Sequence, residues 1–356
     1  MSDINLFQDR VLCTVEQSTS SDNEENFIKM ILNNINKPIK HPKNINLISV
    51  NDNYDLYKFE YQKNTFCLKI SLDPECEYLL KEYKNLKKIN NLISPILIEG
   101  KKIKVGEELY ALMTSFENAD SIYSYGPSII CEKFNNFCHS YKLLQNSKNI
   151  TFDYKHHIKS FLNKNNLNSL SKESLTLIDE YTDLNKLQKI FKNLEKDLKN
   201  INEELINNKK FICHGNLNTK NILYRNNAFK FINFGDCYSC HCFLDLADLF
   251  INLCLDEKSE IYFLNEFCKN FDLNLEENKN LYSICYNIAI RKKLLHILHS
   301  YLKETYLLNS IRQEKIIDIA KDFSNNFQRF LKINYFFENK DFIFKTITEP
   351  ILYEKA

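Results

Sequence analysis

Glycine, proline and tryptophan are scarce in this chain, whose 356 residues include 5 Gly, 6 Pro and no Trp. The sequence contains neither a G-x-x-x-x-G-K-[ST] nor a G-x-G-x-x-G motif, so a glycine-rich phosphate cradle is not supported. The loop at residues 51–55, between two predicted strands, has no glycine either. Asn, Lys and Ile are abundant, which suits AT-rich codons, so a single Asn or Lys residue carries little weight as evidence.

Net charge and long apolar runs are also lacking. The 47 Lys and Arg residues nearly balance the 46 Asp and Glu residues, for a net charge of +1, which removes the electrostatic case for nucleic-acid binding. No apolar run approaches the roughly 20 residues that span a bilayer, and the opening residues lack the pattern of a signal peptide. The 12 Cys are scattered without a paired framework, as is typical of reduced thiols. We therefore expect a cytoplasmic protein that binds neither nucleic acid nor membrane.

The first third of the chain predicts a sheet. Residues 1–22 are polar, and a helix is predicted over residues 23–36 from its apolar spacing. Strand-like runs then follow at residues 45–50, 56–62, 65–71, 95–105 and 109–116. A helix is predicted between the third and fourth runs, over residues 74–90, with Pro74 in its first turn. This order indicates an N-terminal tail and helix (residues 1–44) and a β-rich domain (residues 45–117) whose antiparallel sheet carries one crossing helix.

Two charged residues stand out in this domain because apolar neighbours surround them. Lys69 lies inside an apolar strand, and Glu82 lies on or beside the apolar stripe of the crossing helix. An unpaired charge is costly in such a position. The simplest solution is an ion pair between Lys69 and Glu82. The alternative is that both side chains extend to the surface of the domain.

The most informative stretch is residues 211–236. It predicts a short buried strand at residues 211–213, a polar loop from His214 to Asn221, and a hairpin that turns at Asn226-Asn227, a pair that tolerates positive φ. A second polar cluster, Asn233 to Asp236, leaves the hairpin. Short polar side chains held between apolar strands are typical of a functional site.

The remainder is predicted to be mostly helical and to form one domain over residues 118–356, with the 211–236 hairpin inside it. The expected helices cover residues 128–145, three segments within 154–207, then 243–255, 259–271, 278–307 and 311–330. Residues 339–356 give no clear pattern, and His156-His157 is interpreted as a solvated pair.

Taken together, these motifs resemble the aminoglycoside phosphotransferase and choline kinase family of small-molecule kinases. The run from His214 to Asn221, H-G-N-L-N-T-K-N, resembles the H-G-D-x-x-x-x-N catalytic loop of the family. Ile232-Asn233-Phe234 is similar to its I-D-F/W metal-binding segment, and Asp245-Leu246-Ala247 to the D-L-A that opens the next helix. The matching order extends over residues 45–260. The resemblance implies a bilobal α+β protein-kinase-like fold with ATP and Mg²⁺ as cofactors and a small molecule as phosphoryl acceptor.

The resemblance also implies a nucleotide site in the β-rich domain. Lys69, held by Glu82, would bind the phosphates of ATP as a point charge. Residues 112–116 occupy the place of the hinge strand that receives adenine through backbone groups, which makes Met113 and Ser115 the candidate contacts.

Catalytic and metal roles fall to the second domain. His214 and Asp245 would brace the loop, and Asn221 would bind Mg²⁺ through its amide oxygen. The family has Asp at the positions of Asn216 and Asn233, as catalytic base and metal ligand respectively. An amide cannot act as a base and carries no charge, whereas Mg²⁺ is usually held by one or two carboxylates. Both key carboxylates are therefore replaced.

Three interpretations of this replacement stay open. The chain is a pseudokinase that binds a nucleotide or small molecule, a working kinase in which Asp236 substitutes as a metal ligand, or an engineered inactive form. Drift is a further origin for the two changes, since each needs one G-to-A step. A separate alternative is an unrelated α+β protein with a chance motif match, in which Lys69 and Glu82 would lie far apart.

A cluster of cysteines follows the metal-like segment, Cys237-x-x-Cys240-His241-Cys242. These side chains are the types that bind zinc, but they are too close in sequence to surround one ion easily, and no second C-x-x-C accompanies them. Reduced cysteines in a connecting loop are the simpler interpretation.

Overall fold

The computed structural model divides the chain into two compact units. Unit 1 comprises residues up to 87 together with 94–118, and unit 2 comprises residues 88–93 together with those from 119 onward. The residues described are 21–36, 38–50, 53–105, 107–125, 128–147, 150, 154–164, 192, 211–253, 255 and 257–308.

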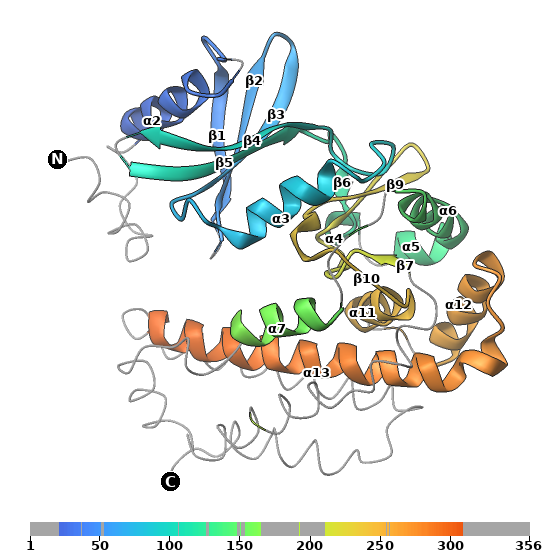
Figure 1. Cartoon of the computed structure of the whole chain (residues 1–356). Coiled ribbons are helices and arrows are strands. Elements are labelled where there is room, and N and C mark those ends of the chain that lie inside the picture. Colours follow the sequence, from blue (N-terminus) through green and yellow to red (C-terminus); the bar gives the residue numbers. More distant parts are fainter. Residues whose placement is uncertain are drawn as a thin grey trace. The chain divides into compact units, whose positions relative to one another are not determined.

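Unit 1 contains a five-stranded antiparallel sheet (Figure 1). Its strands are β1 (Lys43–Val50), β2 (Asp55–Tyr61), β3 (Asn64–Ser71), β4 (Leu97–Val105) and β5 (Glu107–Ser115). The spatial order is β1-β2-β3-β5-β4, so that β5 lies between β3 and β4. All five strands were predicted to within a few residues.

One helix packs on each face of this sheet: α2 (Ser21–Asn33) and α3 (Glu77–Leu86). Alternate residues of a strand face opposite sides. Accordingly, Ala111 and Met113 pack with α2, whereas Leu112 packs with α3. The predicted N-terminal helix is thus part of the core of unit 1.

Unit 2 contains two small antiparallel sheets. One pairs β7 (Phe211–Cys213) with β10 (Tyr238–Cys240), and the other has the order β6 (Asp120–Ser121), β8 (Ile222–Arg225) and β9 (Ala228–Phe231). In the β8–β9 hairpin, Arg225 pairs with Ala228, and the two turn residues have φ values of 52° and 61°. The prediction that Asn226-Asn227 turns this hairpin at positive φ is confirmed.

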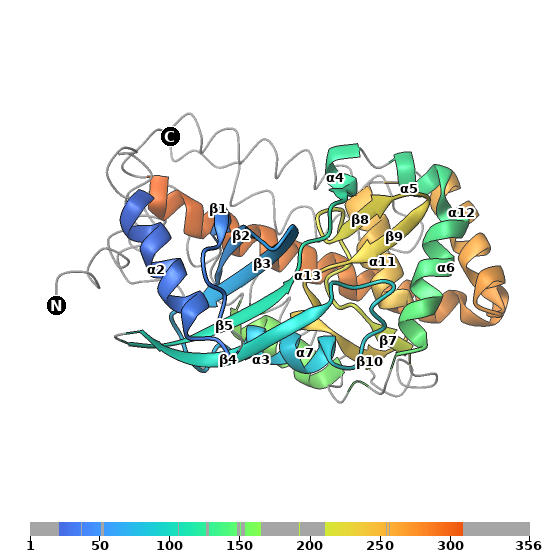
Figure 2. The same cartoon turned by 90° about the horizontal axis from the view of Figure 1, so that it is seen from above.

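Helices make up most of the rest of unit 2. They are α4 (Ile122–Tyr125), α5 (Ser128–Glu132), α6 (Phe134–Gln145), α7 (Tyr154–Lys164), α11 (Phe243–Leu253), α12 (Glu257–Asn270) and α13 (Leu275–Leu308). Helix α6 lies alongside β9 and β7, with α12 on its other side (Figure 2).

Helix α6 holds the small sheets in place through aromatic packing and one side-chain amide. Phe137 lies edge-on to Phe229 and Phe231 of the hairpin, with ring centroids 5.9 and 6.1 Å apart. Gln145 accepts a hydrogen bond from the backbone N–H of Ile212 at 2.8 Å and donates one to its carbonyl at 3.0 Å. The side chain of Gln145 therefore satisfies both backbone polar groups of Ile212, as a neighbouring strand would.

Three local predictions are wrong. Pro74 lies in a turn before α3, which begins at Glu77. The helix predicted over residues 128–145 is broken at Lys133, whose φ and ψ are −117° and 30°. His157 is buried and stacks on Tyr238, with ring centroids 4.3 Å apart, so that it is no solvated residue. The helices predicted over residues 165–207 and 311–330, and the ending at 339–356, lie outside the described residues apart from residue 192.

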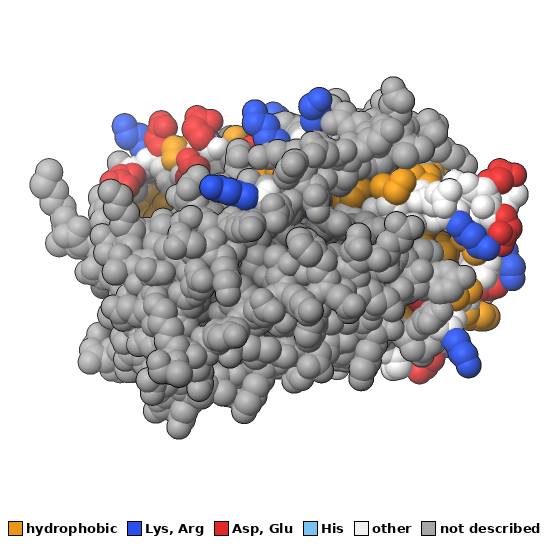
Figure 3. Space-filling model, turned by 90° about the horizontal axis from the view of Figure 1, so that it is seen from below, with side chains coloured by type: hydrophobic (Ala, Val, Ile, Leu, Met, Phe, Trp, Pro, Cys, Tyr) orange, Lys and Arg blue, Asp and Glu red, His pale blue; other side chains and the backbone are white. Residues whose placement is uncertain are grey.

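The described surface carries charges of both signs. Figure 3 shows acidic and basic side chains interspersed on the coloured part of this face, in keeping with the near balance of charge in the sequence. Among the helices that the structure describes, none is long and apolar enough to cross a membrane.

Candidate functional site

Lys69 of β3 and Glu82 of α3 form a buried ion pair in unit 1. The Lys69 Nζ atom lies 2.7 Å from both carboxylate oxygens of Glu82, and the two residues are 6% and 2% exposed. The predicted pair is therefore confirmed. The alternative in which both side chains extend to the surface is wrong. The alternative of an unrelated protein with a chance motif match is also wrong in its expectation that the two residues lie far apart.

Strand geometry explains why the two residues meet. Leu68 and Ile70 belong to the core cluster on the α2 face, so Lys69 points to the α3 face, where it lies in register with Leu112. The ring of Tyr54 lies 4.7 Å from Lys69 Nζ and adds a cation–π contact. Tyr54 was not among the site residues predicted from the sequence.

The environment keeps the Lys69 side chain charged. Burial, the largest single effect, lowers the pKa of the ammonium group, but the charge and hydrogen bonds of Glu82 together with the neighbouring Tyr54 outweigh it, and the pKa of Lys69 is raised. A fixed, charged ammonium group can bind an anionic ligand such as a phosphate.

Met113 and Ser115, the candidate adenine contacts, lie in β5 with strands on both sides. Met113 is buried in the α2-side core. The backbone N–H of Ser115 donates to Ile96 at 2.9 Å, and the next N–H, that of Phe116, donates to Thr65 at 3.0 Å. The sheet thus uses these two backbone donors. Adenine contacts at Met113 and Ser115 stay a prediction.

In unit 2, Asp245 organises the His214–Asn221 loop. Its carboxylate accepts hydrogen bonds from the backbone N–H groups of His214 and Gly215, the latter at 2.9 Å, and from the hydroxyl of Tyr141 at 2.8 Å. Asp245 is fully buried at the start of α11. Burial raises the pKa of this carboxyl group to about 6, although the three hydrogen bonds act in the opposite direction.

His214 and Gly215 fix the loop against the segment that follows β9. The Nε2 atom of His214 lies 2.8 Å from the carbonyl oxygen of Ile232, and its ring packs on Phe234 with centroids 4.9 Å apart. Gly215 has a φ of 82°, and a Cβ atom there would overlap the carbonyl oxygen of Asp236. Only glycine fits this position without strain. His214 and Asp245 both contact the loop and its neighbouring segment, as was predicted for residues that brace the loop.

The amides of the loop bond to one another. Asn218 donates a hydrogen bond from its side chain to Oδ1 of Asn216 at 2.7 Å, and Asn233 donates one to Oδ1 of Asn221 at 2.7 Å. The side chain of Asn221 in turn donates to the backbone carbonyl of Asn216 at 2.9 Å. Two of the predicted site residues, Asn221 and Asn233, are therefore in direct contact. Asn218 was not singled out from the sequence, although its offset of two from Asn216 suits such a bond.

This arrangement does not fit Mg²⁺. The Oδ1 atom of Asn221, the expected ligand, already accepts a hydrogen bond from Asn233. Both side chains are neutral amides, whereas the ion prefers at least one carboxylate. Asp236, the remaining candidate ligand, lies half-buried at the end of the short 3₁₀ helix η3 (Phe234–Asp236).

The cysteines after this segment, Cys237, Cys240 and Cys242, are buried thiols. Tyr238 to Cys240 form β10, so the prediction of a connecting loop is wrong for these residues. Cys237 donates a hydrogen bond through its thiol to the backbone carbonyl of Cys213 at 2.9 Å. Burial raises the pKa of the Cys213, Cys237 and Cys242 thiols well above the ordinary value. In the part of the chain that the structure describes, no group of three or more His, Cys, Asp or Glu side chains is placed to hold a metal ion.

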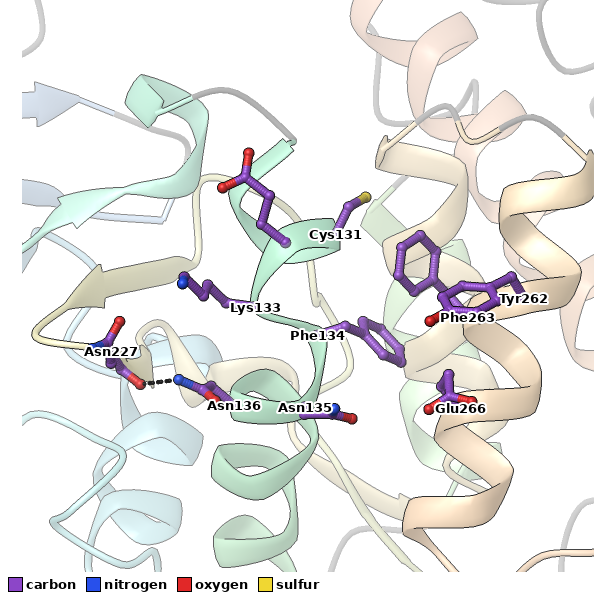
Figure 4. Close-up of a pocket in the computed structure, with 10 residues that line it drawn as sticks. Cys131, Lys133, Phe134, Asn135, Asn136, Asn227, Tyr262, Phe263 and Glu266 are labelled. Atoms are coloured by element: carbon purple, nitrogen blue, oxygen red, sulfur yellow. Dashed lines mark hydrogen bonds between the residues drawn. The ribbon is translucent and has the colours of Figure 1, made fainter.

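A cavity of about 420 Å³ lies elsewhere in unit 2, where α5, α6, α12 and the hairpin turn meet. Lys133, at the break between α5 and α6, lines this cavity. The side chain of Asn136 donates a hydrogen bond to the backbone carbonyl of Asn227 at 2.8 Å (Figure 4). None of its lining residues belongs to the His214–Asn221 loop.

Solved structures identify the fold. No protein-family model matches the sequence, and no curated protein matches it significantly. An ethanolamine kinase from Plasmodium vivax superposes with a TM-score of 0.56 at 12% identity, covering 91% of this chain and 92% of that one. An amicoumacin kinase, solved with AMP-PNP, Ca²⁺ and Ami, gives 0.54 at 12% identity over 86% and 93%. The aminoglycoside phosphotransferase APH(4)-Ia gives 0.52 at 8% identity over 82% and 99%.

The chain therefore has the protein-kinase-like α+β fold that these small-molecule kinases share. The predicted fold class is confirmed, and the resemblance to the aminoglycoside phosphotransferase and choline kinase family holds at the level of the fold.

Proposed function

We propose that this protein is a phosphotransferase-like protein that binds ATP or a related nucleotide together with a small hydroxyl-bearing molecule in the cytoplasm, and that its phosphoryl transfer is slow or absent. The acceptor class is that of the structural neighbours, which are kinases of aminoglycosides and small amino alcohols.

The Lys69–Glu82 pair is the observation that carries the nucleotide-binding part. A buried ion pair is weak evidence for stability alone, because well-packed apolar residues often serve as well. Lys69 is held by both oxygens of Glu82 and keeps its charge. In the family that the sequence resembles, this pair positions the phosphates of ATP.

Slow phosphoryl transfer is expected from the two amides, Asn216 and Asn233. A general base typically contributes about 10²–10⁴ in rate, and Asn216 cannot act as one. Phosphoryl transfer depends mainly on positioning and on the stabilisation of charge, so the loss of the base alone need not abolish it. The second change, at Asn233, also removes negative charge where the family has its metal ligand.

Retained transfer is the second candidate function, and the position of Asp236 favours it. The backbone of Asp236 lies directly against Gly215 of the loop. Its carboxylate is thus attached to a fixed point of the backbone beside the loop, from which it would supply the negative charge that Asn233 lacks.

Binding and turnover separate the two candidates. ATP binding is measured by calorimetry, and ATP turnover is followed with a panel of aminoglycosides and amino alcohols found by thermal shift. Binding with negligible turnover supports the first candidate. Turnover that Asp236→Ala removes, while ATP binding persists, supports the second. An absence of nucleotide binding, with Lys69→Met indistinguishable from wild type, contradicts both.

A further inference from the structure

The hydrogen bond between the side-chain amides of Asn221 and Asn233 bears on the chemical form in which a nucleotide would bind. We propose that the nucleotide binds to this protein without a divalent cation, with the amides of the loop taking the place of the metal. This inference rests on the proposed function and specifies the chemical form of its ligand, a free rather than a chelated polyphosphate.

The two amides satisfy each other's hydrogen-bonding groups. Two carbonyl oxygens or carboxylates facing one another repel unless a cation lies between them. Here the Nδ2 group of Asn233 donates to Oδ1 of Asn221 at 2.7 Å, so the attraction is supplied without an ion. Reversal of the Asn233 amide alone would leave two oxygens facing each other, and reversal of both would turn the Asn221 oxygen toward the backbone carbonyl of Asn216, which makes the observed orientation the stable one.

The oxygen atoms that a cation would need already accept hydrogen bonds. The Oδ1 atom of Asn216 accepts from Asn218 at 2.7 Å, and Oδ1 of Asn221 accepts from Asn233. A cation that bound these oxygens would share each of them with an N–H donor or displace that hydrogen bond. It would gain only neutral ligands in exchange, which suit Mg²⁺ poorly without a carboxylate.

The loop presents neutral side chains to a polyphosphate at positions 216 and 233. An Asp at position 216 or 233 would repel an unchelated nucleotide, and a bound cation would be needed to offset the repulsion. An amide exerts no such repulsion, and its N–H groups are donors of the kind that phosphate oxygens accept. The change from Asp to Asn thus removes both the ligand for the cation and the need for it.

The test compares ATP binding in excess Mg²⁺ with ATP binding in EDTA, by calorimetry on the full chain. For the wild-type protein we expect the two dissociation constants to agree within about threefold, since neither Asn216 nor Asn233 carries a charge that opposes the free nucleotide. For Asn233→Asp we expect binding at least about tenfold weaker in EDTA than in Mg²⁺. Asn216→Asp should show the same direction and serves as a second variant if the first fails to fold.

A matched control is Asn227→Asp. Asn227 lies in the hairpin turn and, like Asn233, has a positive φ. Its Oδ1 accepts a hydrogen bond from Tyr224 at 2.8 Å, a bond that a carboxylate keeps. It adds the same charge away from the loop and should leave the ratio of the two constants unchanged.

Titration with Mn²⁺ provides a readout that is independent of nucleotide. Electron paramagnetic resonance should detect no protein-bound Mn²⁺ for the wild type, and bound Mn²⁺ for Asn233→Asp. Wild-type binding of ATP that is lost in EDTA would overturn the metal-free inference and leave the proposed function intact. If ATP binds under neither condition, the proposed function fails and the inference fails with it.

Discussion

The hydroxyl of Tyr141 in α6 donates a hydrogen bond to Oδ2 of Asp245 in α11 at 2.8 Å. The same carboxylate holds the backbone of His214 and Gly215. One buried acid therefore connects two helices to the start of the loop that carries the candidate catalytic residues. Its ionisation state must affect the stability of the folded chain.

Stability should depend on pH through Asp245. The folded protein binds this proton with a pKa of about 6, whereas an Asp in an unfolded chain has a pKa of about 4. Between these values the folded state holds more protons, so the contribution of Asp245 to the free energy of unfolding falls as the pH rises. Urea unfolding of wild type and Asp245→Asn should therefore diverge, with the wild type gaining relative to the variant as the pH falls from 6 to 4. A constant difference over this range would contradict the shifted pKa.

Tyr141→Phe should move that pH window upward. The Tyr141 hydrogen bond lowers the pKa of Asp245 against the effect of burial, and its loss should raise the pKa further. The same urea series, run on Tyr141→Phe, should place the pH-dependent change above that of the wild type. Tyr224→Phe is the matched control, because its hydroxyl donates to Asn227 in the exposed hairpin turn rather than to Asp245.

Much of the fold follows from local patterns. Strand β5 runs apolar from Leu109 to Met113, and Asn226-Asn227 is a pair that accepts the positive φ of a tight turn. Lys69 and Glu82 were predictable for the same reason. Each charge interrupts an apolar pattern, and a buried charge needs a partner.

Other features depend on contacts that no local pattern contains. The break at Lys133 has no Pro or Gly to signal it. It lets Phe134 pack against Phe263 of α12, with ring centroids 4.8 Å apart. His157 carries no mark of burial in its own neighbourhood, because its partner, Tyr238, lies on a distant strand. The hydrogen bonds among the Asn side chains were not predicted, because a sequence pattern indicates the charge of each Asn but not which side chains lie beside it in space.

Removal of one partner of the Lys69–Glu82 pair should be strongly destabilising. Glu82→Gln leaves the Lys69 ammonium group buried without a counter-charge, and such changes cost about 3–5 kcal/mol in the free energy of unfolding. The double variant Lys69→Met/Glu82→Leu should recover most of that loss, since both charges are gone, yet bind nucleotide no better than Lys69→Met. Urea unfolding and calorimetry measure the two properties separately.

An exposed ion pair in the same unit provides the control. Lys102 and Glu75 contact each other at the surface, and Glu75→Gln should leave the urea midpoint unchanged within error. Stability of the double Lys69/Glu82 variant as low as that of Glu82→Gln would contradict a mainly functional role for the buried pair.

Gly215→Ala should displace the loop. At φ 82° an alanine is strained, and its Cβ atom would overlap the carbonyl oxygen of Asp236. Asn227→Ala also places an alanine at a positive φ, 61°, but Asn227 already carries a Cβ atom, so no new overlap arises. It should lower the free energy of unfolding by only about 1–2 kcal/mol, for the left-handed conformation. Urea unfolding should show a clearly larger loss for Gly215→Ala. Equal losses would mean that the loop has room to move away from Asp236.

Restoring the two carboxylates should reveal whether the scaffold can still transfer a phosphoryl group. Asn216→Asp returns a base within the braced loop, and Asn233→Asp returns a negative charge next to Asn221. If the remaining geometry is intact, the double variant should turn over ATP with an acceptor from the thermal-shift panel about 10²–10⁴ times faster than the wild type. Each single variant should fall short, because a base and a charge at different points of one reaction act together. ATP consumption that rises equally in Asn227→Asp would assign the effect to added charge in general. No gain in the double variant, with nucleotide binding intact, would show that the acceptor site or the nucleotide geometry has changed as well.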